Sequence, residues 1–144
     1  MRVAHFKVAV AAAALVLSAA AANAETVKFK ADLTGPAETP PTDSKGTGTL
    51  NATFDTATKT LTWTVDYSGL TGPAIAAHFH GPAPVRKAAP IEVPQKPPLD
   101  SPMKGSATLT DAEAKDLMDG MMYFNIHTAE HKPGEIRGQV EKAM

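Results

Sequence analysis

The strongest pattern in the chain is a strict alternation of apolar and polar residues over short runs. It is clearest in VKFKADL (residues 27–33) and returns in TLNATFD (49–55), TLTWTVDY (60–67) and EIRGQVE (135–141). Successive side chains of a strand point to opposite faces, so a period of two predicts antiparallel strands with one face on a core. The first run predicts Val27, Phe29, Ala31 and Leu33 inward, and the third predicts Leu61, Trp63, Val65 and Tyr67 inward. The last run predicts Ile136 and Val140 inward and Glu135, Arg137, Gln139 and Glu141 outward.

The segments between these runs have the composition of turns. They read TGPAETPP, DTATK, SGLTGP and KPGE, and are rich in Gly, Pro, Asp and Thr. Several short strands at this spacing predict an all-β sandwich or barrel. One helix is predicted over residues 111–119, because Thr110 and Glu113 form a capping-box pair and Gly120 stands at the C-terminal cap.

The first 24 residues have the pattern of a secretory signal peptide. Arg2 and Lys7 precede the apolar run 8–22, and Ala22-Asn23-Ala24 fits a small-x-small cleavage site. Cleavage after Ala24 predicts a periplasmic or secreted protein with a single domain, residues 25–144. No later apolar run approaches the roughly 18 residues that span a bilayer, so no membrane anchor is predicted in the mature form.

Charge and cysteine content exclude several classes of function. The formal net charge of the whole chain is −1, and it becomes −3 when Arg2 and Lys7 leave with the signal. This balance argues against nucleic-acid binding and against electrostatic attachment to a membrane surface. The chain has no cysteine, so neither a disulfide nor a thiolate metal ligand is available.

A proline-rich stretch separates the two halves of the chain. Residues 82–102 hold seven of the twelve prolines, which excludes a central strand or a continuous helix. The segment IEV can pair briefly at a sheet edge, and the remainder is predicted as an extended loop. Long loops are often functional, so a protein partner that binds through 82–102 is one possibility. A plain connection is the other.

The histidines of the mature chain lie in two short stretches. AHFHGPA (77–83) contains His78 and His80, and NIHTAEH (125–131) contains His127 and His131. In the first stretch Ile75, Ala77 and Phe79 form the apolar series, so both histidines take the opposite face, about 6.6 Å apart along the strand. In the second, Phe124 and Ile126 are apolar, so Asn125 and His127 take the opposite face. The two sets can meet only if their strands are neighbours or a loop folds over them.

Histidine pairs of this kind point first to a metal. Imidazole is the commonest side-chain ligand of copper and zinc, and His78, His80 and His127 would leave an open position at the ion. His131 is a further candidate ligand. Two other readings stay open: an interaction module whose histidines only bond internally, and a copper-dependent redox enzyme. No Ser/His/Asp motif, HExxH or phosphate-binding loop is present, so catalysis is the weaker prediction.

The same motifs resemble the CHRD (chordin-type) domain family, including its exported bacterial single-domain members. The resemblance rests on A-H-x-H-G-P-A, on N-x-H-T…G-E-I-R-G-Q, and on the early LTGPAETPPTDSKGTGTLNATFD, and covers about residues 26–141. It implies a Greek-key-like β-sandwich. His78, His80 and His127 match the motif positions, whereas His131 stands where similar sequences often carry Asn. We therefore predict an exported, non-catalytic module that binds copper or zinc.

Overall fold

The computed structural model describes residues 9–15 and 23–144. Most of the predicted signal peptide, residues 1–8 and 16–22, lies outside this part. No helix in the described part is long and apolar enough to cross a membrane. The elements are β1 (Thr26–Thr34), β2 (Thr47–Asp55), β3 (Thr60–Ser68), β4 (Ala74–His80), β5 (Ile91–Pro94), β6 (Met103–Thr108), α1 (Asp111–Met118), β7 (Tyr123–Thr128), β8 (Ile136–Gln139) and β9 (Glu141–Lys142).

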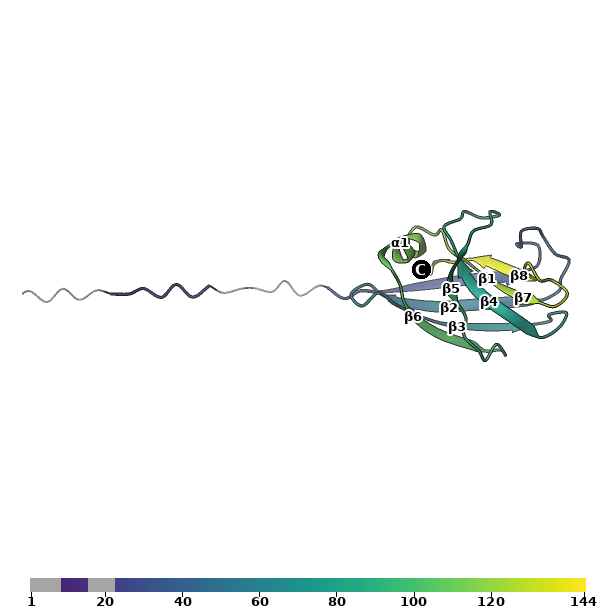
Figure 1. Ribbon diagram of the computed structural model, residues 1–144, viewed down its shortest axis with the longest axis horizontal. Coiled ribbons are helices and arrows are strands. Elements are labelled where there is room, and N and C mark those ends of the chain that lie inside the picture. Colours follow the sequence, from purple (N-terminus) through teal and green to yellow (C-terminus); the bar gives the residue numbers. More distant parts are fainter. Residues whose placement is uncertain (1–8, 16–22) are drawn as a thin grey trace, which may run out of the picture.

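The strands form one antiparallel sheet that folds over on itself. Its order is β5-β4-β7-β8-β1-β2-β3-β6, and β9 pairs with β1. Figure 1 shows β4 and β5 crossing over β2 and β3, with α1 at one end of the layers. The sheet is nearly closed, because the side chain of Gln95 after β5 donates to the carbonyl of Lys104 in β6 at 2.9 Å. The prediction of an all-β antiparallel fold with one short helix is confirmed.

The core lies between the two halves of the sheet and consists of the alternating apolar residues. Trp63 of β3 is 3% exposed, and its ring meets that of Phe79 in β4 edge-on, with centroids 4.9 Å apart. Phe79 in turn packs edge-on against Phe124 of β7 at 4.9 Å. Trp63 also donates from Nε1 to Oε1 of Gln95 at 2.7 Å. The inward assignment of Trp63 is therefore confirmed, and aromatic contacts join the two layers.

The inward assignment of Ile75 is wrong. Its side chain is 52% exposed, whereas Ala77 and Phe79 are buried as expected. Ala74 pairs with Thr128 and Ala76 with His127, so Ile75 is an extra residue in the ladder with β7. Such a bulge interrupts the alternation of faces.

The outward assignment of Glu135 and Arg137 is also wrong, because they are 0% and 2% exposed. The loop of residues 35–46 covers this face of β8. Thr42 donates from Oγ1 to the Glu135 carbonyl at 2.7 Å, and Arg137 donates from Nη1 to Thr39 Oγ1 at 3.1 Å. Gln139 is half-buried and Glu141 is exposed. The polar face of this segment is thus buried beneath the loop at Glu135 and Arg137 and reaches solvent at Glu141.

The Glu135 carboxylate joins three segments from beneath this loop. It accepts hydrogen bonds from Ser44 Oγ at 2.7 Å, from Thr128 Oγ1 at 2.7 Å and from the Thr71 backbone N–H at 3.0 Å. Burial alone would raise the pKa of Glu135, but hydrogen bonds from Thr71, Ser44 and Thr128 outweigh it and lower that pKa. The ionised carboxylate is therefore the stable form in the fold.

The helix and the proline-rich stretch follow the sequence predictions. The capping box of Thr110 and Glu113 is present at α1, and Gly120 just beyond the helix has φ = 71°. Leu117 is buried against the core. The segment Ile91–Pro94 is an edge strand paired with β4 alone.

Candidate metal centre

The predicted histidine-bearing strands, β4 and β7, are neighbours in the sheet. His78 is the register partner of Asn125, His80 of Tyr123, and Ala76 of His127. His78 and His127 therefore lie diagonally across the ladder, on the face away from the aliphatic core. The condition that the sequence left open, adjacency of the two strands, is met.

Three of the four histidines in the described part of the chain converge. His78 Nδ1 lies 3.2 Å from His127 Nε2, and one ligand nitrogen from each of His78, His80 and His127 lies within 4.8 Å of the others. Among the residues that the structure describes, these three form the one group of metal-ligating side chains that could hold an ion. In a tetrahedral site with bonds of about 2.0 Å, donor atoms stand roughly 3.3 Å apart, and the His78 and His127 nitrogens, 3.2 Å apart, have this separation.

Two backbone carbonyls fix the hydrogens on the imidazoles. His80 Nδ1 lies 2.9 Å from the Ala89 carbonyl, and His127 Nδ1 lies 2.7 Å from the Lys132 carbonyl. A carbonyl only accepts, so each Nδ1 carries the hydrogen and donates it. In the neutral ring Nε2 then presents its lone pair. This is the arrangement by which metal-ligating histidines are commonly oriented.

A stack of three side chains holds the plane of the His80 ring. Tyr123 lies parallel to His80, with centroids 4.7 Å apart and an angle of 3°. The guanidinium carbon of Arg137 lies 3.4 Å from the centroid of the same tyrosine ring. The Tyr123 hydroxyl also accepts from the Ala89 N–H at 3.1 Å, so it positions the loop whose carbonyl receives the His80 hydrogen.

Asn125 and Glu38 complete the site, and neither was predicted from the sequence as a site residue. Asn125 Oδ1 lies 2.9 Å from His80 Nε2 and 3.0 Å from His127 Nε2. Its amide Nδ2 donates to Glu38 Oε1 at 2.9 Å, and the Thr39 N–H donates to Glu38 Oε2 at 2.8 Å. Asn125 is 2% exposed and Glu38 3%. The sequence placed Asn125 on the same face as His127, but it held no signal for Glu38, which lies 87 positions away.

His78 and His80 are held in the neutral form, in which an imidazole can bind a metal. Burial, together with the nearby His127 and His80, lowers the pKa of His78 to about 4. Burial also lowers the pKa of His80. At neutral pH both rings are therefore uncharged, with lone pairs available.

The structure does not bring His131 into this group. Its carbonyl accepts from the Gly134 N–H at 3.0 Å within the turn before β8. Its side chain lines a separate hollow of about 390 Å³, with Pro40, Pro41 and Asp43 among its neighbours.

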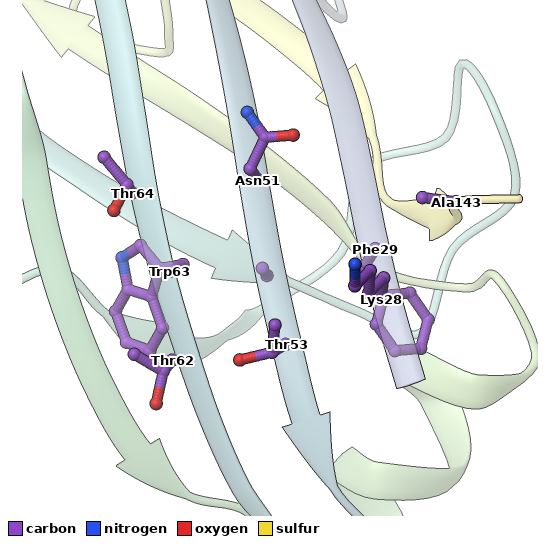
Figure 2. Close-up of a pocket in the computed structure, with 9 residues that line it drawn as sticks. Lys28, Phe29, Asn51, Thr53, Thr62, Trp63, Thr64 and Ala143 are labelled. Atoms are coloured by element: carbon purple, nitrogen blue, oxygen red, sulfur yellow. The ribbon is translucent and has the colours of Figure 1, made fainter. Parts of the chain in front are cut away.

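A second hollow, of about 400 Å³, lies on the outer face of β1, β2 and β3 (Figure 2). Figure 2 shows Asn51, Thr53, Thr62 and Thr64 along these strands, with Lys28 and Ala143 beside them. The lining offers hydroxyl, amide and ammonium groups, and none of the four histidines belongs to it. Within residues 9–15 and 23–144, the one candidate metal-ligating group therefore lies on the β4–β7 face.

Comparisons with known proteins agree with the motifs. The family model described as CHRD domain matches residues 29–140, a range that includes all of the strands that carry the histidine group. Neither the curated proteins nor the solved structures contain a match to this chain. On the evidence of that match, the chain belongs to the CHRD domain family.

Proposed function

We propose that this protein is an exported, non-catalytic metal-binding module that holds one copper or zinc ion between His78, His80 and His127. One observation carries the proposal. The Ala89 and Lys132 carbonyls fix the hydrogens of His80 and His127 on Nδ1, so both Nε2 lone pairs point into the space that His78 Nδ1 also borders.

The donor set favours these two metals. Imidazole suits zinc and copper, whereas magnesium and calcium prefer oxygen ligands. The chain has no cysteine to supply thiolate. A site of fixed neutral imidazoles at a partly open surface therefore fits a borderline divalent ion.

The alternative is an interaction module in which the histidines only anchor loops. The bonds from His80 to the Ala89 carbonyl and from His127 to the Lys132 carbonyl favour it, because each ties a loop to a strand. His78 separates the two functions. Within the described part of the chain, its Nδ1 contacts another histidine and no backbone carbonyl. A loop-anchoring role therefore does not account for His78.

Titration calorimetry on the metal-free protein tests the proposal. We expect one Zn²⁺ or Cu²⁺ per chain. Replacement of His78, His80 or His127 by Ala should weaken binding by more than about 100-fold, beyond the 10–100-fold typical of outer-shell partners. His131→Ala is the matched control and should change the affinity by less than about threefold. Absence of any binding tighter than millimolar would leave the loop-anchoring function.

Export and a protein partner are further parts of the proposal. The signal-like residues 1–24 support export, and intact mass of the exported protein should show an N-terminus at Glu25. The stretch 82–102 supports a partner surface, since Val85 and Ile91 are 61% and 52% exposed. Retention of the first 24 residues in the exported protein would contradict cleavage after Ala24.

A further inference from the structure

The side-chain oxygen of Asn125 faces the lone pairs of two imidazoles. Its Oδ1 lies 2.9 Å from His80 Nε2 and 3.0 Å from His127 Nε2. Both nitrogens are acceptors in the neutral rings, because their Nδ1 hydrogens are donated to carbonyls. His78 Nδ1, 3.2 Å from His127 Nε2, can donate a hydrogen to that nitrogen, but no hydrogen lies between Asn125 Oδ1 and either Nε2 atom.

Rotation of the amide does not remove the conflict. Asn125 Nδ2 donates to Glu38 Oε1 at 2.9 Å, and a flipped amide would place Oδ1 against that carboxylate instead. Glu38 is itself fixed, because its other oxygen accepts from the Thr39 N–H at 2.8 Å. Glu38 therefore holds Oδ1 of Asn125 toward the histidines.

A single proton also leaves part of the conflict in place. A proton on His80 Nε2 would satisfy the contact with Asn125 Oδ1 but not the 3.0 Å contact between Oδ1 and His127 Nε2. A cation coordinated by all of these atoms satisfies them together. The negative charge of Glu38, relayed through the amide dipole, adds to the attraction for a cation.

We propose that Asn125 is the fourth ligand of the site through Oδ1, oriented by Glu38, and that the bound ion is divalent zinc or copper rather than copper(I). This inference rests on the proposed function. An amide oxygen is a hard donor, whereas copper(I) is selected by the soft sulfur of Cys and Met. Three imidazoles and one carbonyl oxygen therefore form a donor set for Zn²⁺ or Cu²⁺.

The test compares affinities for Zn²⁺, Cu²⁺ and copper(I) by competition with chromophoric chelators. Asn125→Ala should weaken Zn²⁺ and Cu²⁺ binding by more than about 100-fold, beyond the 10–100-fold typical of outer-shell partners, and change copper(I) binding by less than about threefold. Asn51→Ala is the matched control, because Asn51 is an exposed asparagine on the outer face of β2. It should leave all three affinities unchanged.

The double variant Glu38→Gln/Asn125→Asp keeps the test valid if Asn125→Ala does not fold. It preserves the hydrogen bond with its direction reversed and presents an anionic oxygen to the ion. Zn²⁺ affinity should then rise by about 10-fold or more, since a carboxylate is a common zinc ligand.

The outcomes separate the two proposals. If the wild-type protein binds none of the three ions, both proposals fail. If it binds Zn²⁺ but neither the Asn125→Ala nor the double variant changes that affinity, Asn125 is not a ligand and only this inference is overturned. Tighter binding of copper(I) than of Cu²⁺ would likewise overturn the assignment of a divalent ion.

Discussion

Replacement of Trp63 tests the packing that holds the two layers together. The side chain is 3% exposed, meets Phe79 edge-on at 4.9 Å and donates to Gln95 Oε1 at 2.7 Å. Loss of a buried Trp to Ala costs about 3–5 kcal/mol, and an orphaned buried acceptor adds about 1–3 kcal/mol. We therefore expect Trp63→Ala to lower the free energy of unfolding by about 4–8 kcal/mol.

Trp63→Phe serves as the matched variant. It keeps an aromatic ring against Phe79 but removes the bond to Gln95, so its cost should be about 1–3 kcal/mol plus a smaller packing term. Urea unfolding should be followed by far-ultraviolet circular dichroism, because Trp63 is the one tryptophan of the chain and its fluorescence is lost in both variants. A cost below about 1 kcal/mol for Trp63→Ala would refute the assignment of this ring to the core.

Three further predictions concern the turn behind the site and the response to acid. Gly134→Ala should both destabilise the fold and weaken zinc binding. Gly134 has φ = 131°, and an added Cβ would overlap the Glu38 carboxylate. The control is Gly120→Ala, since Gly120 has φ = 71° and open space around it, and this change should cost only about 1 kcal/mol of stability. Equal effects of the two substitutions in thermal unfolding and in zinc calorimetry would contradict this prediction. The pKa of Glu135 is lowered in the folded protein. Its contribution to folding stability is therefore present above the pKa of the unfolded chain and is lost as the pH falls through the pKa of the folded state. Glu135→Gln should therefore lower stability at pH 7 and make the urea unfolding midpoint depend less on pH in the acid range. An unchanged dependence on acid pH would contradict this prediction. Since the pKa of His78 falls from 6.5 to about 4, the metal-free fold should lose stability as the pH drops from 6.5 toward 4, and His78→Ala should reduce that loss; a midpoint constant over this range would argue the opposite.

The parity of each strand was sufficient to predict the face of the histidines. The period of two placed His78 and His80 opposite Ala77 and Phe79, and the structure confirms that both of these apolar residues are buried. Local chemistry also predicted the helix, because the capping box of Thr110 and Glu113 lies within three residues. Features set by neighbouring residues could thus be read directly.

Features set by distant segments could not. The burial of Glu135 and Arg137 follows from the loop 35–46, which is distant from them in the sequence and contacts them only in the folded protein. The contact between Asn125 and Glu38 spans 87 positions, and no periodicity connects them. Ile75 failed for another reason: a bulge adds one residue to a strand without any mark in its composition.

X-ray absorption at the zinc edge of the zinc-loaded protein tests the central claim most directly, because it counts the imidazoles at the ion. We predict three imidazole nitrogens from His78, His80 and His127 in the first shell, with bonds of about 2.0–2.1 Å, and loss of one imidazole in His78→Ala. A shell of oxygen atoms, or a spectrum unchanged in all three alanine variants, would show that zinc binds elsewhere and that these histidines are not its ligands.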